Sequence, residues 1–227
     1  MKHFLFFASA LACLLTACSE RYSIQGRSTQ SILDGKMAYL RTINGTGSKT
    51  LDSCEVLHGR FAMSGPLDSV QFVHLYLGSE DFIPIVLEEG EISIDVDNAA
   101  VRMSGTPLND RLFVFLTSRD SLNLLRAELP RKESSMILEG YDEDYIIDCL
   151  GQEEMEYVRQ IDQLETQFIK ANYDNILGVT WFLQLCTQAY KTFGYPTTTP
   201  QIDEIYLGAP ESFKQHPDIS LYIEACQ

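Results

Sequence analysis

The spacing of apolar residues changes once along the chain, and this change constrains the fold more than any other feature. From Tyr22 to Gly105 apolar residues recur mainly at every second position between turn signals, which is typical of half-buried β-strands. In the segment EISIDVD, the isoleucines and one valine take one face, and the acidic residues and a serine take the other. After Thr106 the spacing becomes helical. We therefore predict an α+β chain, with an antiparallel β-sandwich or flattened barrel over residues 22–105 and an all-helical region over residues 106–227.

The start of the helical region carries its own signal. Thr106 can cap a helix, and Pro107 suits the first helical position, where its missing N–H costs nothing. We expect the first helix over residues 108–129, a second over about 142–172 with a possible break at Gly151, a third over 175–193, and two short helices after the loop GYPTTTP. The third is strongly apolar, and it is too short and too polar at its edges to span a membrane.

The first 17 residues have the zones of a secretory signal: a positive start at Lys2 and an apolar run that is too short to cross a bilayer. The run ends in Leu15-Thr16-Ala17-Cys18, which resembles the lipobox of bacterial lipoproteins. That resemblance implies cleavage between Ala17 and Cys18, and attachment of lipid to Cys18. A plain secretory signal followed by a chance cysteine is the alternative.

The lipobox also predicts a location. Residues 1–17 would be the signal peptide, and residues 18–21 a short tether that holds the folded part close to a membrane. Several acyl chains give durable anchoring, so we expect a protein of the cell envelope, at the outer membrane. The sequence does not say which leaflet holds the anchor.

The chain is acidic, with 17 Lys and Arg residues against 32 Asp and Glu residues and a formal net charge of −15. This charge disfavours binding to nucleic acid or to an anionic lipid surface, because both would be repelled. It names no partner by itself.

Four cysteines follow Cys18, at positions 54, 149, 186 and 226. None forms a Cys-x-x-Cys couple, the usual arrangement of a redox-active dithiol. In an oxidising envelope they could form two disulfides, and their apolar surroundings fit buried free thiols as well. If residues 152–172 and 175–193 form a helical hairpin, Cys186 lies too far along it from Cys149 for a bond between these two.

No metal, cofactor or catalytic group is predicted. His58, His74 and His216 do not pair at zinc-ligand spacing; His58 fits a tight turn with Gly59, and His74 fits a half-buried strand. The segment DVDN lacks the glycine and the late glutamate of a calcium loop.

The usual catalytic motifs are also missing. The sequence has no serine elbow, phosphate-binding loop or dinucleotide fingerprint. Glu88 and Glu89 are neighbours, so on a strand they would point to opposite faces and could not work as an acid/base pair.

With metal ligands and catalytic motifs excluded, aromatic residues are the candidate binding groups. Tyr39, Phe72 and Tyr76 could line a groove, although aromatic residues on strands more often fill a core. Trp181 is expected in the core, because it lies on the apolar helix.

Several fragments in register resemble a known family. The segments YSIQG, DGKMAYL, LDSCEVLHGRFAMSG, PIVLEEGEISID and MSGTPLND look like the amino-terminal domain of unknown function found in Bacteroidetes envelope lipoproteins. In that family the domain commonly precedes a thioredoxin-like domain of the TlpA or peroxiredoxin type. The segment that would carry the redox Cys-x-x-Cys is not present in this sequence.

Two functions follow as expectations. The first is a lipid-anchored, non-catalytic envelope module that binds a protein, peptide or glycan. The second is a thiol–disulfide exchange protein, or an accessory to a separate thioredoxin-fold oxidoreductase. The missing Cys-x-x-Cys favours the first, since a fold resemblance does not transfer activity.

Overall fold

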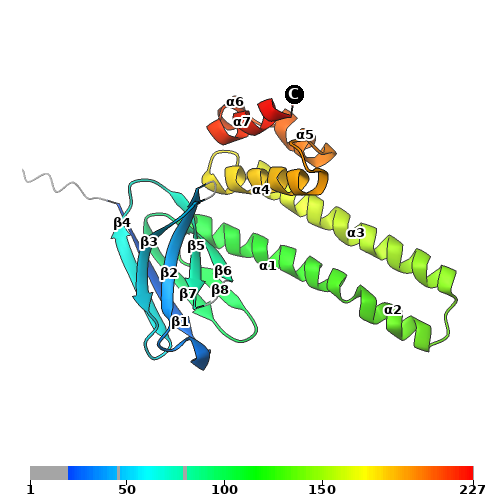
Figure 1. Ribbon diagram of the computed structural model, residues 1–227, viewed down its shortest axis with the longest axis horizontal. Helices are drawn as coiled ribbons and strands as arrows, with labels where there is room; N and C mark the ends of the chain where they lie inside the picture. Colours follow the sequence, from blue (N-terminus) through cyan, green and yellow to red (C-terminus); the bar gives the residue numbers. More distant parts are fainter. Residues whose placement is uncertain (1–19, 45–46, 79–80, 227) are drawn as a thin grey trace, which may run out of the picture.

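The computed structural model describes residues 20–44, 47–78 and 81–226, and it has a β-sandwich at one end and helices at the other (Figure 1). Eight strands form the sandwich: β1 (Arg21–Ser28), β2 (Met37–Asn44), β3 (Gly47–Glu55), β4 (Arg60–Pro66), β5 (Gln71–Leu77), β6 (Phe82–Leu87), β7 (Gly90–Val96) and β8 (Val101–Ser104). A short 3-10 helix, η1 (Ser31–Leu33), lies between β1 and β2.

The helical half follows the last strand. Its helices are α1 (Pro107–Ala127), α2 (Leu129–Leu138), α3 (Glu143–Lys170), α4 (Ile176–Phe193), α5 (Pro200–Leu207), α6 (Glu211–Lys214) and α7 (Pro217–Ala225). The predicted α+β architecture is therefore confirmed.

The sandwich consists of two separate four-stranded sheets, in the orders β4-β1-β7-β8 and β3-β2-β5-β6, so the flattened barrel is ruled out. The expectation of a purely antiparallel sandwich was wrong in one place, because β1 pairs with β7 in parallel. Every other strand pair in the two sheets is antiparallel.

The predicted alternation sets the faces of the sheets. Ile92, Ile94 and Val96 are buried in the core between the sheets, whereas the intervening residues of β7 face outward. Val73, Leu75 and Leu77 do the same from β5, in the other sheet.

A tight turn was predicted at His58 and Gly59, and it is confirmed. Both residues have positive φ, 51° and 68°, and Leu57 and Arg60 exchange two backbone hydrogen bonds across them. The strands on either side then separate, because β3 belongs to one sheet and β4 to the other. The turn thus carries the chain from one layer to the next, which the sequence pattern did not reveal.

Three further expectations needed correction in the helical half. Three short helices, α5, α6 and α7, follow the loop where two were expected. The chain after Leu129 was expected to leave the helical pattern, but residues 129–138 form α2. The possible break at Gly151 does not occur, since α3 runs without interruption from Glu143 to Lys170. Figure 1 shows α1 and α2 leading away from the sandwich and α3 returning beside α1.

The sandwich meets the helices at a group of four buried residues that we call the edge joint. It consists of the polar side chains of Glu88, Thr106 and Asn109 and the backbone of Val86. β6 is an edge strand, and Val86 turns its backbone groups outward from the sheet. The Asn109 side chain satisfies both of them, accepting from Val86 N at 2.9 Å and donating to Val86 O at 2.7 Å. An amide side chain thus takes the place of a neighbouring strand.

The cap of α1 also comes from the edge joint. Thr106 occupies the N-cap position, but its side chain makes no capping hydrogen bond and instead accepts from Asn109 Nδ2 at 2.8 Å. Glu88 provides the cap from the end of β6: its carboxylate accepts from the backbone N–H groups of Leu108 and Asn109, at 2.8 and 3.1 Å. A carboxylate at this helix end also suits the helix dipole.

The hydrophobic core continues from the sandwich into the helices. Leu112 and Phe115 of α1, Phe168 of α3 and Leu177 of α4 belong to the same buried cluster as the sheets. The Phe115 and Phe168 rings stack with centroids 3.9 Å apart, and the edge of Trp181 meets Phe115 at 4.6 Å. Trp181 also contacts a second cluster, formed by α4 and the C-terminal helices. The helices and the sandwich therefore share a packed interface.

Across the described ranges, no helix is both long enough and apolar enough to pass through a bilayer.

The edge joint generates the first prediction. Asn109→Ala leaves both backbone groups of Val86 buried without partners, so the free energy of unfolding should fall by about 3 kcal/mol. Urea denaturation of the purified chain measures this change. Asn98→Ala is the matched control, because Asn98 is exposed, and it should change stability by less than about 0.5 kcal/mol. Equal effects of the two substitutions would show that the edge joint is not a major source of stability.

Candidate functional site

The outer surface of the sheet β3-β2-β5-β6 carries a cluster of ring and cationic side chains that we call the aromatic face. Its members are Tyr39, Arg41, Phe72, His74, Tyr76 and Phe82. They alternate along β2 and β5 with residues of the sandwich core such as Leu40 and Leu75, so they must point away from it. Phe82 is 48% exposed, and most of the other members are half-buried.

The pairing of the strands brings these residues together. Tyr39 of β2 lies opposite Tyr76 of β5, and Tyr76 lies opposite Phe82 of β6, which makes one row across three strands. Arg41 lies opposite His74 in the adjacent row. Cross-strand neighbours of this kind are close enough for their side chains to touch.

Arg41 is held by two aromatic rings. Its guanidinium carbon is 4.8 Å from the centre of the Tyr39 ring and 5.1 Å from that of Tyr76, which are distances typical of cation–π contacts. The buried Arg41 Nε has no hydrogen-bond partner within the described part of the chain. The charge is thus positioned by rings, and no carboxylate among the described residues forms an ion pair with it.

His74 lies at the centre of the aromatic face. Its ring stacks on Phe82 with centroids 3.8 Å apart, and it meets the edges of Phe72 and Tyr76 at 5.9 and 6.3 Å. Burial lowers the pKa of His74 below its ordinary value of 6.5, which favours the neutral ring. Its Nδ1 has no hydrogen-bond partner among the residues described.

Sequence reasoning found part of this site. Tyr39, Phe72 and Tyr76 were candidates for a groove or for the core, and the structure places all three on the outer side of one sheet. Phe72 also packs against the edge of the core cluster, so it marks the border between the two. The prediction that His74 is a half-buried strand residue is confirmed.

Arg41 and Phe82 were missed, and so was the role of His74 beside them. The alternation in VQFVHLYL could have placed His74 between Phe72 and Tyr76 on one face. The contribution of Phe82 depends on the register of β5 against β6, which the sequence alone does not show.

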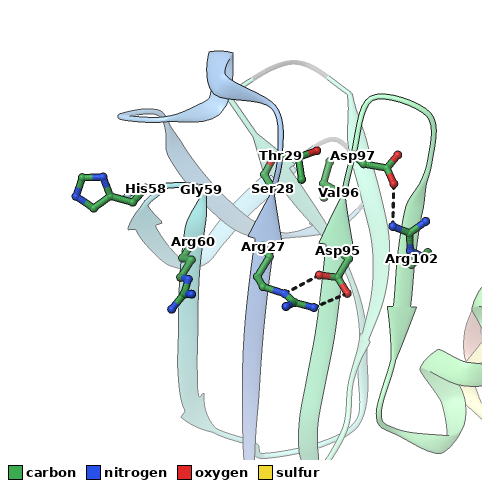
Figure 2. Close-up of a pocket in the computed structure, with 10 residues that line it drawn as sticks. All are labelled: Arg27, Ser28, Thr29, His58, Gly59, Arg60, Asp95, Val96, Asp97 and Arg102. Atoms are coloured by element: carbon green, nitrogen blue, oxygen red, sulfur yellow. Dashed lines mark hydrogen bonds and ion pairs between the residues drawn. The ribbon is translucent and has the colours of Figure 1, made fainter.

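A second charged surface lies on the other sheet, in an open hollow of about 370 Å³ (Figure 2). Arg27 donates from Nε and Nη2 to the two carboxylate oxygens of Asp95, at 2.8 and 3.2 Å. Arg102 pairs with Asp97 at 2.8 Å. Figure 2 shows the His58 ring pointing away from these pairs. Because both aspartates are neutralised by arginines, we interpret the hollow as an exposed structural ion-pair network, worth little binding energy by itself.

Asp97 also explains the segment DVDN. Its Oδ1 accepts from the backbone N–H groups of Ala99 and Ala100 at 2.8 and 2.7 Å. These two bonds, and then Arg102, lower the pKa of Asp97. The segment is therefore the end of β7 followed by a turn. In the described residues, no group of three or more His, Cys, Asp or Glu side chains could hold a metal ion.

A third surface is the arm formed by α2 and the facing part of α3. It exposes apolar side chains, among them Leu138 at 89% and Ile137 at 60%, and Tyr141 stacks on Tyr145 at 5.7 Å. The arm offers exposed apolar side chains. The aromatic face combines ring faces with a fixed cation and a histidine, so we take it as the candidate site.

The four cysteines of the described residues do not form a thiol site of the kind that redox enzymes use. Cys54, Cys149, Cys186 and Cys226 all carry free thiols. Burial raises the pKa of Cys54 and Cys226, and it raises that of Cys186 to about 12. The thiolate is the reactive form, so these three thiols are poor nucleophiles at neutral pH.

The predicted lipidation and cleavage sites, Ala17 and Cys18, lie outside the described residues.

The chain is thus an α+β protein with a two-sheet sandwich, a helical half and a candidate binding face. One protein family matches part of it. Residues 22–112 match a family described as a domain of unknown function (DUF4369). The resemblance to such an amino-terminal domain is therefore confirmed for this part of the chain, and no thioredoxin-like domain was found. The matched residues include both sides of the edge joint. No curated protein and no solved structure matches the chain.

The lowered pKa of His74 predicts a pH effect on stability. The unfolded chain takes up the proton as the pH falls through about 6.5, before the folded chain does, so stability should decrease as the pH falls below that value. In His74→Gln this contribution is absent, and the loss of stability between about pH 7.5 and about pH 5.5 should be smaller than in the wild type. The urea midpoints of the wild type and of His74→Gln, measured between about pH 7.5 and about pH 5.5, test this prediction.

His58→Asn serves as the control for this experiment, because His58 is exposed and asparagine tolerates its positive φ. It should keep the pH dependence of the wild type. A wild-type slope in His74→Gln would contradict the assignment.

Proposed function

We propose that this protein is a lipid-anchored, non-catalytic module of the cell envelope that binds a protein, peptide or glycan partner through the aromatic face. The observation that carries the proposal is the row of rings on one sheet surface, with a cation held between two of them. Binding sites are commonly lined by aromatic groups with a few placed polar groups. The acidic chain, at a net charge of −15, favours a partner that is neutral or basic.

The chemistry of the face suits such partners. The exposed faces of aromatic rings can pack against the apolar side of a sugar ring or against an aromatic side chain. Arg41 can donate hydrogen bonds from a position that its two neighbouring rings have already fixed. Little conformational freedom of the Arg41 side chain remains to be lost on binding, which favours affinity.

The anchor is proposed from the lipobox at Leu15 to Cys18. β1 begins at Arg21, so only a few residues separate Cys18 from the sandwich. Leu67 N donates to Glu20 O at 2.9 Å, which ties the start of the described chain to the end of β4. Acylation of Cys18 would therefore hold this end of the sandwich close to the membrane.

The alternative, thiol–disulfide exchange by the protein itself, has less support. Such activity needs an accessible thiol with a low pKa, and burial raises the pKa of Cys54, Cys186 and Cys226. A role as an accessory to a separate thioredoxin-fold oxidoreductase is a special case of partner binding, and the same experiments address it.

The anchor predicts a labelling result. Cys18→Ala should lose incorporation of a labelled fatty acid in growing cells and leave an unprocessed or misplaced precursor. Cys13→Ala is the matched control, since Cys13 lies in the segment expected to be removed, and it should retain the label. Full labelling of Cys18→Ala would refute the anchor.

The partner surface can be tested by photo-cross-linking in intact cells. A photo-reactive phenylalanine analogue replaces Phe82 on the aromatic face, Leu138 on the arm or Ser64 on the exposed side of the other sheet. We expect a defined cross-linked product from position 82 and several-fold less from positions 64 and 138. Adding Tyr76→Ala should reduce the yield at position 82 several-fold, because it removes one of the rings that hold Arg41.

Products confined to position 138 would move the partner to the arm and contradict the aromatic face as the binding surface. Equal yields at all three positions would indicate random collision, and they would also contradict the aromatic face as the binding surface. Circular dichroism of each variant confirms that it remains folded.

A further inference from the structure

The fold brings two of the cysteines to the same part of the helical half. Cys186 lies on α4 and is 2% exposed, whereas Cys226 is half-buried and follows directly after α7. Helices α4 and α7 pack together at the top of the helical half in Figure 1. Cys54 belongs to the sandwich, and Cys149 lies on the arm beside Lys132.

Tyr222 connects the two cysteines. Its hydroxyl donates to the backbone oxygen of Cys186 at 2.9 Å, and Thr197 O lies at the same distance. Cys226 lies one helical turn further along, and the Tyr222 hydroxyl is close enough to its thiol to lower the pKa of Cys226. The thiol of Cys226 therefore faces the backbone of Cys186 across a single hydroxyl group.

The electrostatics agree with this placement. Burial raises the pKa of Cys186 first of all, and the neighbouring Cys226 raises it further. This effect agrees with neighbouring positions for the two thiols, because the interaction between charges weakens with distance.

We propose that Cys186 and Cys226 form an intramolecular disulfide when the protein meets a disulfide donor. The bond would fasten the last helix, α7, to the central helix, α4. A disulfide needs Cα atoms within about 7 Å, and Cys226 can adjust because it lies at the end of its helix. The inference goes beyond the proposed binding function and does not depend on it.

The reaction is a two-step exchange. The thiolate of Cys226, the more exposed of the two, attacks one sulfur of the donor disulfide, which forms a mixed disulfide and releases one donor thiolate. The thiolate of Cys186 then attacks Cys226 Sγ, which closes the protein disulfide and releases the second donor thiolate. The protein loses two hydrogens and two electrons, and the donor gains them as two thiols. Because both pKa values are raised, the rate should increase with pH.

The sequence offers a direct readout. Trypsin cleaves after Lys and Arg, so the four cysteines fall in four different peptides: residues 50–60, 133–159, 171–191 and 215–227. The folded chain is incubated with oxidised glutathione, alkylated and digested without reduction. We expect one linked species, which joins the peptide 171–191 to the peptide 215–227.

Three variants sharpen the result. Cys186→Ala and Cys226→Ser should abolish the linked species, and Cys149→Ala, a change on the arm, should leave it at the wild-type level. The oxidised wild type should also show a higher Tm than the reduced protein, because the bond closes a long loop in the unfolded chain. Cys226→Ser should show no such shift under the same treatment.

Two outcomes would overturn the inference. One is a stable glutathione adduct on Cys226 that Cys186 never displaces, which would mean that the thiols cannot meet. The other is a linked species that forms only in urea, or in which Cys54 and Cys149 take part as often, which would mean that the fold does not select the pair.

Discussion

Asn109 joins the first helix to the open edge of the sandwich at β6. The Asn109 amide satisfies both free backbone groups of Val86, and Glu88, just beyond β6, caps the helix that begins beside it. One group of side chains therefore closes an open sheet edge and fixes the start of α1. The core then continues without interruption from the sheets to Phe115 and Phe168. The helices are fastened at this edge, and the outer surface of the same sheet presents the aromatic face.

Local patterns predicted much of this fold. The alternation through Ile92 and Ile94 indicated a sandwich, and Thr106-Pro107 marked the start of the helices. The features that were missed depend on contacts between distant parts of the chain. Glu88 caps a helix that begins about 20 residues later, which no local rule foresees. The transfer of the chain between sheets at His58 follows from the pairing of β4 with β1, and the turn residues are the same as in an ordinary hairpin.

The candidate site, like the fold, could be predicted from the sequence only in part. The three aromatic residues on β2 and β5 could be selected from the sequence, but their environment could not, because either face of a strand can be the buried one. Register decides the rest: it places Arg41 between Tyr39 and Tyr76 and brings Phe82 onto His74. The outcome is a surface of rings around a cation, and this is the surface through which we propose that a partner binds.

The central claim is that the aromatic face is covered by a partner in the cell, and hydroxyl-radical footprinting tests it most directly. Intact cells and the purified protein are labelled in parallel, and oxidation is read at each ring by mass spectrometry. Tyr190 and Tyr195 are exposed, at 49% and 59%, and serve as internal references. The account predicts that Phe82 and Tyr76 are oxidised several-fold less in cells than in the purified protein, while the two references are unchanged. Equal oxidation of Phe82 and Tyr76 in both preparations would contradict it.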